Sequence, residues 1–244
     1  MSLDGGREVS TADMGLTTQA RGQKRNGAIR SDLDPAVKTV SGGRRSSAFA
    51  RVELEHYVEE PWVSRRLLEL LAQRSLAMFD TVYDPAAGFG HIPQSARRLG
   101  LEGRGSDIVQ RAPDIRGGVD FLTHDFSATP FDRRLLIACN PPFSLLAEFA
   151  ARALDVAAPG GAVALLAPTR RINTASGWLR AMPLQRLLFC TPRPSLLPGE
   201  IYRQRVADGT PLGSGREEVC WLIFEKGASY EGRADWLHRE GGTA

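Results

Sequence analysis

The chain has 244 residues, of which 42% are hydrophobic and 24% charged, the balance of an ordinary globular protein. It contains no apolar run of about 18 residues and no basic and apolar leader at its start, so we expect neither a membrane helix nor secretion. Its three cysteines and four histidines lack the spacing of metal ligands or of a disulfide framework. We therefore expect a cytoplasmic protein with reduced, buried thiols and no metal site.

The net charge of +3 is carried by residues 1–50. This stretch is rich in glycine, serine, threonine, arginine and aspartate and has no hydrophobic period, which predicts a flexible tail followed by one domain over residues 51–244. The domain holds 23 basic and 23 acidic residues. Its neutrality weakens the case for a nucleic-acid partner but is compatible with one, because only the binding face must be positive.

The first part of the domain predicts a helix and then strands alternating with helices. Pro61 suits the first turn of the opening helix. A strand at 81–84 is followed by a glycine turn and a second helix. Further strands are expected at 103–108 ("GRGSDI"), 117–122 ("GGVDFL") and 135–140 ("LLIACN"). The last of these is apolar throughout, as in a sheet covered on both faces.

After the fourth strand, Ser144 is a candidate N-cap for a helix with one apolar face. Strands are then expected at 162–168, 184–191 and 218–226, the last two separated only by a polar loop at 192–217. That spacing predicts an antiparallel hairpin at the end of the sheet. The whole alternation predicts an α/β domain with a mostly parallel sheet of seven strands.

The motif "DPAAGFG", residues 84–90, follows the first strand. Gly88 and Gly90 allow a tight turn and a close approach to a ligand at the carboxyl ends of the strands. Pro93 stands where a dinucleotide fingerprint requires a third glycine, which argues against NAD or FAD. Asp107, at the end of the expected second strand, has the spacing of a carboxylate that binds a ribose hydroxyl.

Two acidic–aromatic pairs compete for a contact with an adenine ring. Asp120 with Phe121 ends the expected third strand, and Asp125 with Phe126 follows five residues later. A carboxylate at either place can accept a hydrogen bond from an adenine amine. We prefer Asp120 because it ends the more apolar run, and the spacing leaves Asp125 open.

The motif "CNPPF" ends the fourth strand, which we expect beside the first, so that both strand ends face one cleft. The side-chain carbonyl of Asn140 and the main-chain carbonyl of Pro141 offer two acceptors for the hydrogens of an exocyclic amine. Pro142 stiffens the backbone, and Phe143 offers a ring for stacking. Such a pair favours an amine whose lone pair points at an electrophile, which predicts transfer to a planar amine by positioning and electrostatics.

Taken in order, "DPAAGFG", "GSDI", "GGVDFL" and "CNPPF" resemble the S-adenosylmethionine-dependent amino-methyltransferases, especially small phage- or prophage-like members of the DNA adenine-N6 type. The segment "HYVEEPWVSRRLLELL", residues 56–71, resembles the cofactor-lining segment that precedes the glycine loop in this group. The resemblance covers residues 56–227 and implies a Rossmann-like class I methyltransferase fold. It also implies a catalytic motif of Asn140, Pro141, Pro142 and Phe143. The cofactor contacts that it implies are Tyr57, Pro61, Asp84, Pro85, Ala86, Gly88, Gly90, Asp107, Ile108, Asp120 and Phe121.

The substrate stays open at this level. The motif fits adenine in DNA, another planar amine in RNA or on a protein glutamine, and a non-catalytic relative that keeps the fold. Residues 169–218 are the stretch left for target recognition, which is short, so strong sequence selectivity is not expected. Arg170, Arg171, Arg180 and Arg186 are either phosphate contacts or ordinary surface arginines.

Overall fold

The computed structural model describes residues 53–73, 78–128, 131–174 and 176–240. The tail expected over residues 1–50 lies outside these ranges. Within them, no helix has the length and apolar character needed to cross a membrane.

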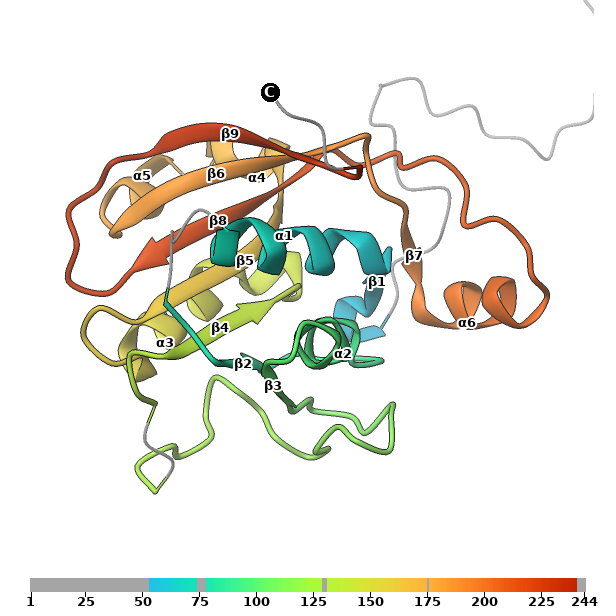
Figure 1. Ribbon diagram of the computed structural model, residues 1–244, viewed down its shortest axis with the longest axis horizontal. Helices are drawn as coiled ribbons and strands as arrows, with labels where there is room; N and C mark the ends of the chain where they lie inside the picture. The colour runs from blue at the N-terminus through green and yellow to red at the C-terminus, as the bar shows by residue number, and fades with distance from the viewer. Residues whose placement is uncertain (1–52, 74–77, 129–130, 175, 241–244) are drawn as a thin grey trace, which may run out of the picture. The chain divides into compact units, whose positions relative to one another are not determined.

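The main sheet has seven strands in the order β3-β2-β4-β5-β8-β6-β9 (Figure 1). They are β2 (Thr81–Asp84), β3 (Glu102–Gly105), β4 (Leu135–Cys139), β5 (Ala162–Pro168), β6 (Leu184–Thr191), β8 (Val219–Glu225) and β9 (Arg233–His238). β8 is antiparallel to β5 and β6, and every other pairing is parallel. The mostly parallel, Rossmann-like sheet predicted from the sequence is confirmed, as is the antiparallel pairing of its last two predicted strands.

A small second sheet and the helices complete the described part. The small sheet pairs β1 (Tyr57–Glu59) with β7 (Leu196–Pro198) in antiparallel fashion. The α-helices are α1 (Pro61–Gln73), α2 (His91–Arg98), α3 (Leu146–Val156), α4 (Thr169–Thr174), α5 (Ser176–Arg180) and α6 (Gly199–Ala207). Two short 3-10 turns are η1 (Glu53–Glu55) and η2 (Phe143–Leu145).

The two faces of the main sheet carry two separate hydrophobic clusters. Along β4, Leu136 and Ala138 belong to the cluster that includes α1 and α2, whereas Leu135, Ile137 and Cys139 belong to the cluster that includes α3. Successive residues of a strand point to opposite faces. β4 is therefore apolar throughout because both faces are covered, and Figure 1 shows α1 and α2 on one side of the sheet with α3 on the other.

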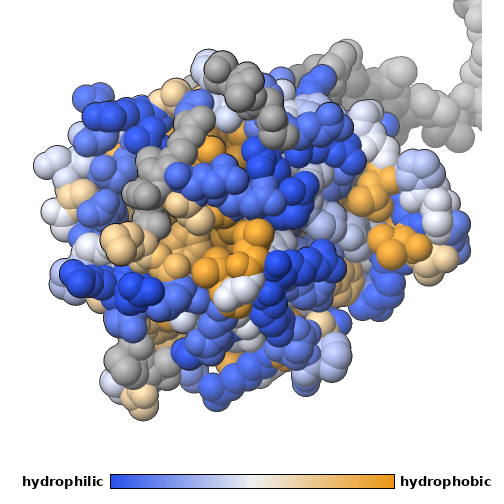
Figure 2. Space-filling model, in the orientation of Figure 1, coloured by the Kyte–Doolittle hydropathy of each residue, from blue (hydrophilic) through white to orange (hydrophobic). Residues whose placement is uncertain are grey.

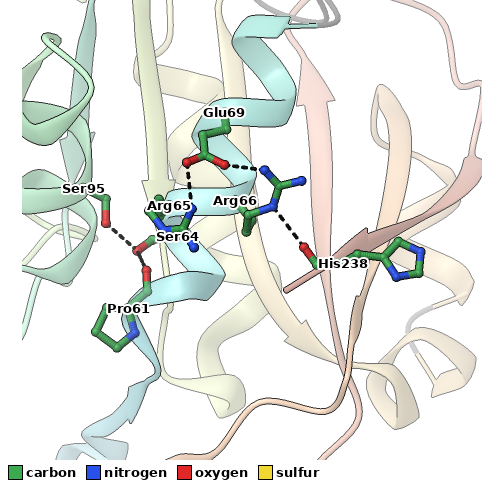
Figure 3. Close-up of polar contacts among 7 residues, drawn as sticks. All are labelled: Pro61, Ser64, Arg65, Arg66, Glu69, Ser95 and His238. Carbon is green, nitrogen blue, oxygen red and sulfur yellow. Dashed lines mark hydrogen bonds and ion pairs between the residues drawn. The ribbon is translucent and has the colours of Figure 1, made fainter. Parts of the chain in front are cut away.

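Helix α1 ties the first part of the chain to the last (Figure 3). The Ser64 and Ser95 hydroxyls are 3.0 Å apart and join α1 to α2. At the other side of α1, Arg66 Nε donates to the main-chain carbonyl of His238 in β9 at 3.0 Å. Glu69 pairs with the same guanidinium. Since β1 directly precedes α1, this helix also fixes where β1 lies.

Residues 117–122, predicted as the third strand, do not form one. The nearest approach to strand pairing there is a single bridge between Ser106 and Arg116. Gly118 has a φ of +72°, and the Asp120 carboxylate accepts the Leu122 N–H at 3.0 Å. A side chain that bonds the backbone two residues on favours a turn over a sheet ladder. The seventh strand is instead β9, an edge strand with exposed residues that carried little pattern.

Two further local predictions are corrected. Ser144 is not an N-cap, because η2 precedes α3 and the Ser144 N–H donates to Glu55 Oε2 at 3.0 Å. The stretch at 192–217 is not only loop, because it forms β7 and α6. On this side of the molecule apolar residues gather at the surface (Figure 2), and Val206 of α6 is exposed.

Candidate functional site

The site lies where β2 and β4 end side by side. These strands are parallel neighbours, with Tyr83 opposite Ile137. The chain leaves β2 toward β3 on one side and leaves β4 toward β5 on the other, which makes this the switch point of the sheet. Asp84 ends β2 and Asn140 follows β4, so the two sequence motifs meet as predicted.

A cavity of about 400 Å³ opens at this edge and is lined by both motifs together with β1. Eleven of the expected site residues line it: Tyr57, Asp84, Pro85, Ala86, Gly88, Asp107, Ile108, Asp120, Phe121, Asn140 and Pro142. Four do not, namely Pro61, Gly90, Pro141 and Phe143. Pro61 begins α1 and Gly90 caps α2, while Pro141 is buried and Phe143 begins η2.

The glycine loop is compact and is fixed by its own backbone. The Ala86 N–H donates to Asp84 Oδ1 at 3.0 Å, and the Gly88 N–H donates to Asp107 Oδ2 at 2.8 Å. Gly88 has a φ of +50°, and a Cβ placed there would lie 2.8 Å from His56 Nε2. Glycine is therefore required at 88 both by the backbone conformation and by the packing of His56.

Three buried carboxyl groups surround one end of the cavity. Asp84, Glu59 and Asp107 are each less than a tenth exposed. Burial raises the pKa of Asp84 well above its usual range, and the nearby Glu59 and Asp107 raise it further. A positively charged ligand in this cavity would relieve that repulsion.

Asp107, which the sequence predicts to accept a ribose hydroxyl, already has protein partners. Its Oδ1 accepts from the Val109 N–H at 2.9 Å and from the Arg111 guanidinium at 2.8 Å, and its Oδ2 accepts the Gly88 N–H. A carboxylate has about four acceptor positions. One position of Asp107 is therefore left for a ligand.

The structure separates the two acidic–aromatic pairs. Asp120 and Phe121 line the cavity, whereas Asp125 does not and instead accepts the Ser127 N–H at 2.8 Å. Phe121 is buried, with its ring centroid 5.4 Å from that of Phe149. Asp120 thus reaches the cavity from a turn and not from the end of a strand.

Asn140 is oriented by β1. Its Nδ2 donates to the main-chain carbonyl of Tyr57 and to Glu59 Oε2, both at 2.9 Å. A main-chain carbonyl and a carboxylate only accept, so the nitrogen of the amide must face β1 and the oxygen must face away. The described residues provide no hydrogen bond to Asn140 Oδ1.

The sequence did not indicate several residues of the site. Glu59 and His56 lie just before α1, far from both motifs in the chain, and Arg111 lies in the loop that replaces the third strand. Burial and the nearby Arg111 charge lower the pKa of His56 to about 4, so its ring is neutral at ordinary pH. The available signal was the row of acidic residues at 59–60 before a helix start, which also reads as ordinary helix capping.

The four candidate arginines fall at opposite edges of the sheet. Arg170 and Arg171 follow the carboxyl end of β5, on the edge that carries the cavity. Arg186 lies opposite Ile223, whose partner Ala164 is near the start of β5, and Arg180 precedes β6. Only Arg170 and Arg171 of this set are placed for a substrate at the cavity.

No protein-family model and no curated protein sequence matches the chain. A candidate RNA methyltransferase of Pyrococcus horikoshii is similar in structure at 16% identity and a TM-score of 0.48, over 71% of this chain and 87% of its own. A candidate class I S-adenosylmethionine-dependent methyltransferase of Listeria monocytogenes reaches 14% and 0.48, over 72% and 64%. A candidate hemolysin of Lactococcus lactis reaches 10% and 0.48, over 70% and 89%. Similarity this remote assigns no function, and the site itself must indicate the chemistry.

Proposed function

We propose that this protein is an S-adenosylmethionine-dependent N-methyltransferase that methylates the N6 amine of adenine in DNA. The observation that carries the proposal is the Asn140 amide, whose nitrogen is fully engaged by β1 and whose oxygen is left as an acceptor at the cavity. That acceptor belongs to an Asn-Pro-Pro-Phe motif at the switch point of a Rossmann-like sheet. The motif and its position together favour transfer to a planar amine.

The residues that line the cavity fit the cofactor. The sulfonium and ammonium groups of S-adenosylmethionine are positive, and the buried carboxyl groups of Asp84 and Glu59 favour a cation at this end. Asp107 keeps one acceptor position for a ribose hydroxyl. Asp120 and Ile108 line the cavity on the side of the loop after β3, where an adenine ring would lie. When bound, the cofactor supplies a methyl group on a sulfonium that needs no further activation.

The chain's own residues then act on the amine. Asn140 Oδ1 accepts one amine hydrogen, and the Pro141 carbonyl is the expected acceptor for the other, since the Pro142 carbonyl already accepts the Leu145 N–H at 2.9 Å. Holding both hydrogens directs the nitrogen lone pair at the methyl group. Once the nitrogen carries the methyl group, it would release one of these hydrogens to water as a proton. Phe143, half-buried beside this pair, is assigned the stacking contact with the base.

A base in a duplex must leave the stack to reach Asn140. The domain has no net charge, so binding of a nucleic acid would depend on a local group of positive side chains. Arg170 and Arg171 lie on the edge of the sheet that carries the cavity. This placement favours a nucleic acid over a protein glutamine as substrate. The choice of DNA over RNA rests on the resemblance of the motifs.

The test uses the full chain with methyl-labelled S-adenosylmethionine and, in separate reactions, DNA, RNA and protein extract. Each substrate is then digested and the labelled product identified. We expect N6-methyladenine from DNA, and none from the same reaction with an Asn140→Ala variant. Label in RNA adenine or in glutamine alone would overturn the DNA assignment, and cofactor binding without any transfer would favour a non-catalytic relative.

A further inference from the structure

Glu59 was not among the site residues predicted from the sequence, yet it contacts the side-chain amide of Asn140. It is 5% exposed, and its Oε2 is 2.9 Å from Asn140 Nδ2, although the two residues are 81 positions apart. A buried carboxylate needs strong partners to offset its lost hydration. The side-chain amide of Asn140 is a hydrogen-bond partner of the Glu59 carboxylate.

The second support of Asn140 comes from how β1 pairs with β7. The Gly199 N–H donates to the His56 carbonyl at 3.1 Å, so residues 56 and 199 form a hydrogen-bonded pair and the next pair, Tyr57 and Pro198, is a non-hydrogen-bonded one. The Tyr57 carbonyl is therefore not used by the small sheet. It points instead to Asn140 Nδ2.

We propose that Glu59 is a positioning residue: with the Tyr57 carbonyl, its carboxylate holds the Asn140 amide so that Oδ1 faces the cavity as an acceptor. An asparagine held by one partner can turn its amide over, and then an N–H would face the substrate amine. Two acceptors on the nitrogen exclude that orientation. This inference deepens the proposed function, on which its catalytic meaning rests.

The carboxylate also changes the strength of the acceptor. A hydrogen bond to an ionised group is stronger than one between neutral groups, and hydrogen bonds in a chain polarise one another at low dielectric. The Glu59 carboxylate pushes electron density onto Nδ2 through the N–H it accepts, and amide resonance passes this density to Oδ1, which becomes more negative. Glu59 thus acts on the substrate amine through Asn140 and does not touch it.

Three variants separate charge, bonding and mere burial. Glu59→Leu removes the acceptor, so we expect a fall in kcat of about 100-fold, as for loss of one preorganised polar contact. Glu59→Gln keeps an acceptor oxygen without the charge and should recover most of the loss, to within about tenfold of the parent. Both variants remove the Glu59 charge, so cofactor affinity should fall by the same factor in the two, and kcat is compared at saturating cofactor; the KM for DNA should stay within about twofold in both.

Glu60→Gln is the matched control. Glu60 is the adjacent residue, is also buried, and accepts the Ser195 N–H at 2.8 Å without touching Asn140. Its kcat should stay within about twofold of the parent. A fall in Glu60→Gln equal to that in Glu59→Leu would show that any damage to this strand lowers the rate, and would overturn the inference.

A measurement on the ligand-free protein makes the result independent of catalysis. The side-chain amide resonances of Asn140 are identified by their loss in Asn140→Ala. They should shift and exchange faster in Glu59→Leu and be unchanged in Glu60→Gln. Unchanged resonances in Glu59→Leu would overturn the positioning role, whereas failure of the parent to methylate DNA, RNA or protein would overturn the proposed function.

Discussion

The two loops that meet at the switch point are held in opposite ways. The glycine loop is held locally: its Ala86 and Gly88 N–H groups bond carboxylates 2 and 19 residues away. Asn140 is held by partners 83 and 81 residues earlier in the chain. The glycine loop, the proposed binding half of the site, is thus fixed largely by its own motif, whereas the orientation of Asn140, in the proposed reacting half, depends on the tertiary fold.

The contrast extends to what each half demands of its residues. The glycine loop tolerates little change because its backbone conformation is unusual, with φ of +50° at Gly88 and +80° at Gly90. The Asn140 loop has ordinary backbone angles at its start but needs β1 in place, and β1 in turn needs β7. Removal of the Asn140 side chain should therefore leave the glycine loop intact.

The largest expected effect isolates the reacting half. Asn140→Ala removes the acceptor and should lower kcat by about 100- to 1,000-fold. Cofactor affinity, measured by calorimetry, should stay within about twofold because the glycine loop does not depend on Asn140. Turnover that persists in this variant would contradict the role of Asn140, and a parallel loss of cofactor binding would contradict the independence of the two halves.

The next effect isolates the binding half. Gly88→Ala should weaken cofactor binding by about 10- to 100-fold, because the new Cβ meets His56 Nε2 at 2.8 Å and the backbone is left-handed. Gly100→Ala is the matched control, since Gly100 has a φ of +78° but nothing within 4 Å of its Cβ. Gly100→Ala should lose about 1 kcal/mol of unfolding free energy and Gly88→Ala more, because of its contact with His56, and only Gly88→Ala should lose affinity. Equal affinities in the two variants would contradict the assignment.

A third prediction concerns the charge at Asp84. Its raised pKa means that the ligand-free protein keeps this carboxyl neutral above the usual range, and stability falls as pH rises and the carboxyl ionises. Affinity for the cationic cofactor should rise over the same pH range, because the ionised form attracts it. Asp84→Asn should therefore lower affinity by about tenfold, remove this pH dependence and raise the melting temperature of the ligand-free protein at neutral pH.

The control for the affinity measurement is Asp125→Asn, which changes an exposed carboxylate outside the cavity and should leave cofactor affinity and its pH dependence unchanged. Thermal unfolding and cofactor titration from acid to alkaline pH supply both readouts. A wild-type affinity that does not change with pH would show that Asp84 is not the charge that the cofactor meets.

The smallest effect tests where the nucleic acid lies. Arg170→Ala should raise the KM for DNA by a few-fold and reduce its salt dependence by about one phosphate contact, because Arg170 is on the cavity edge. Arg180→Ala, on the opposite edge, should change neither. Equal changes in the KM for DNA in both variants would mean that DNA does not bind specifically at the cavity edge. No change in Arg170→Ala would show that the cavity edge near Arg170 is not part of the DNA interface.

The sequence predicted well the strands and loops that are determined by the local pattern of residues. Apolar runs bounded by glycine or proline predicted β2, β4, β5, β6 and β8, and the two loop motifs follow directly from those strands. The pattern failed at 117–122, where Asp120 bonds its own backbone, and at β9, an edge strand that buries Leu237 but exposes Trp236. A regular spacing of apolar residues indicates which residues of a segment are buried, and neither of these segments is buried as a central strand is.

The contact of Glu59 with Asn140 could not be predicted from the sequence for a different reason. Its role depends on a hydrogen bond across 81 positions and on the register of a small sheet that pairs residue 57 with residue 198. No local period encodes such a contact. The stretch at 192–217, read as a loop open to target recognition, instead forms the strand that supports β1.

The pairing of β1 with β7 has a kinetic consequence. Contacts between distant parts of a chain form slowly, since loop closure must precede them. The hydrogen bonds of the glycine loop join residues within 19 positions, whereas those of Asn140 need β1, and β1 pairs with a strand near residue 197. During refolding, the hydrogen bonds of the glycine loop should therefore form before those of Asn140, and the interval between the two would time the docking of β7.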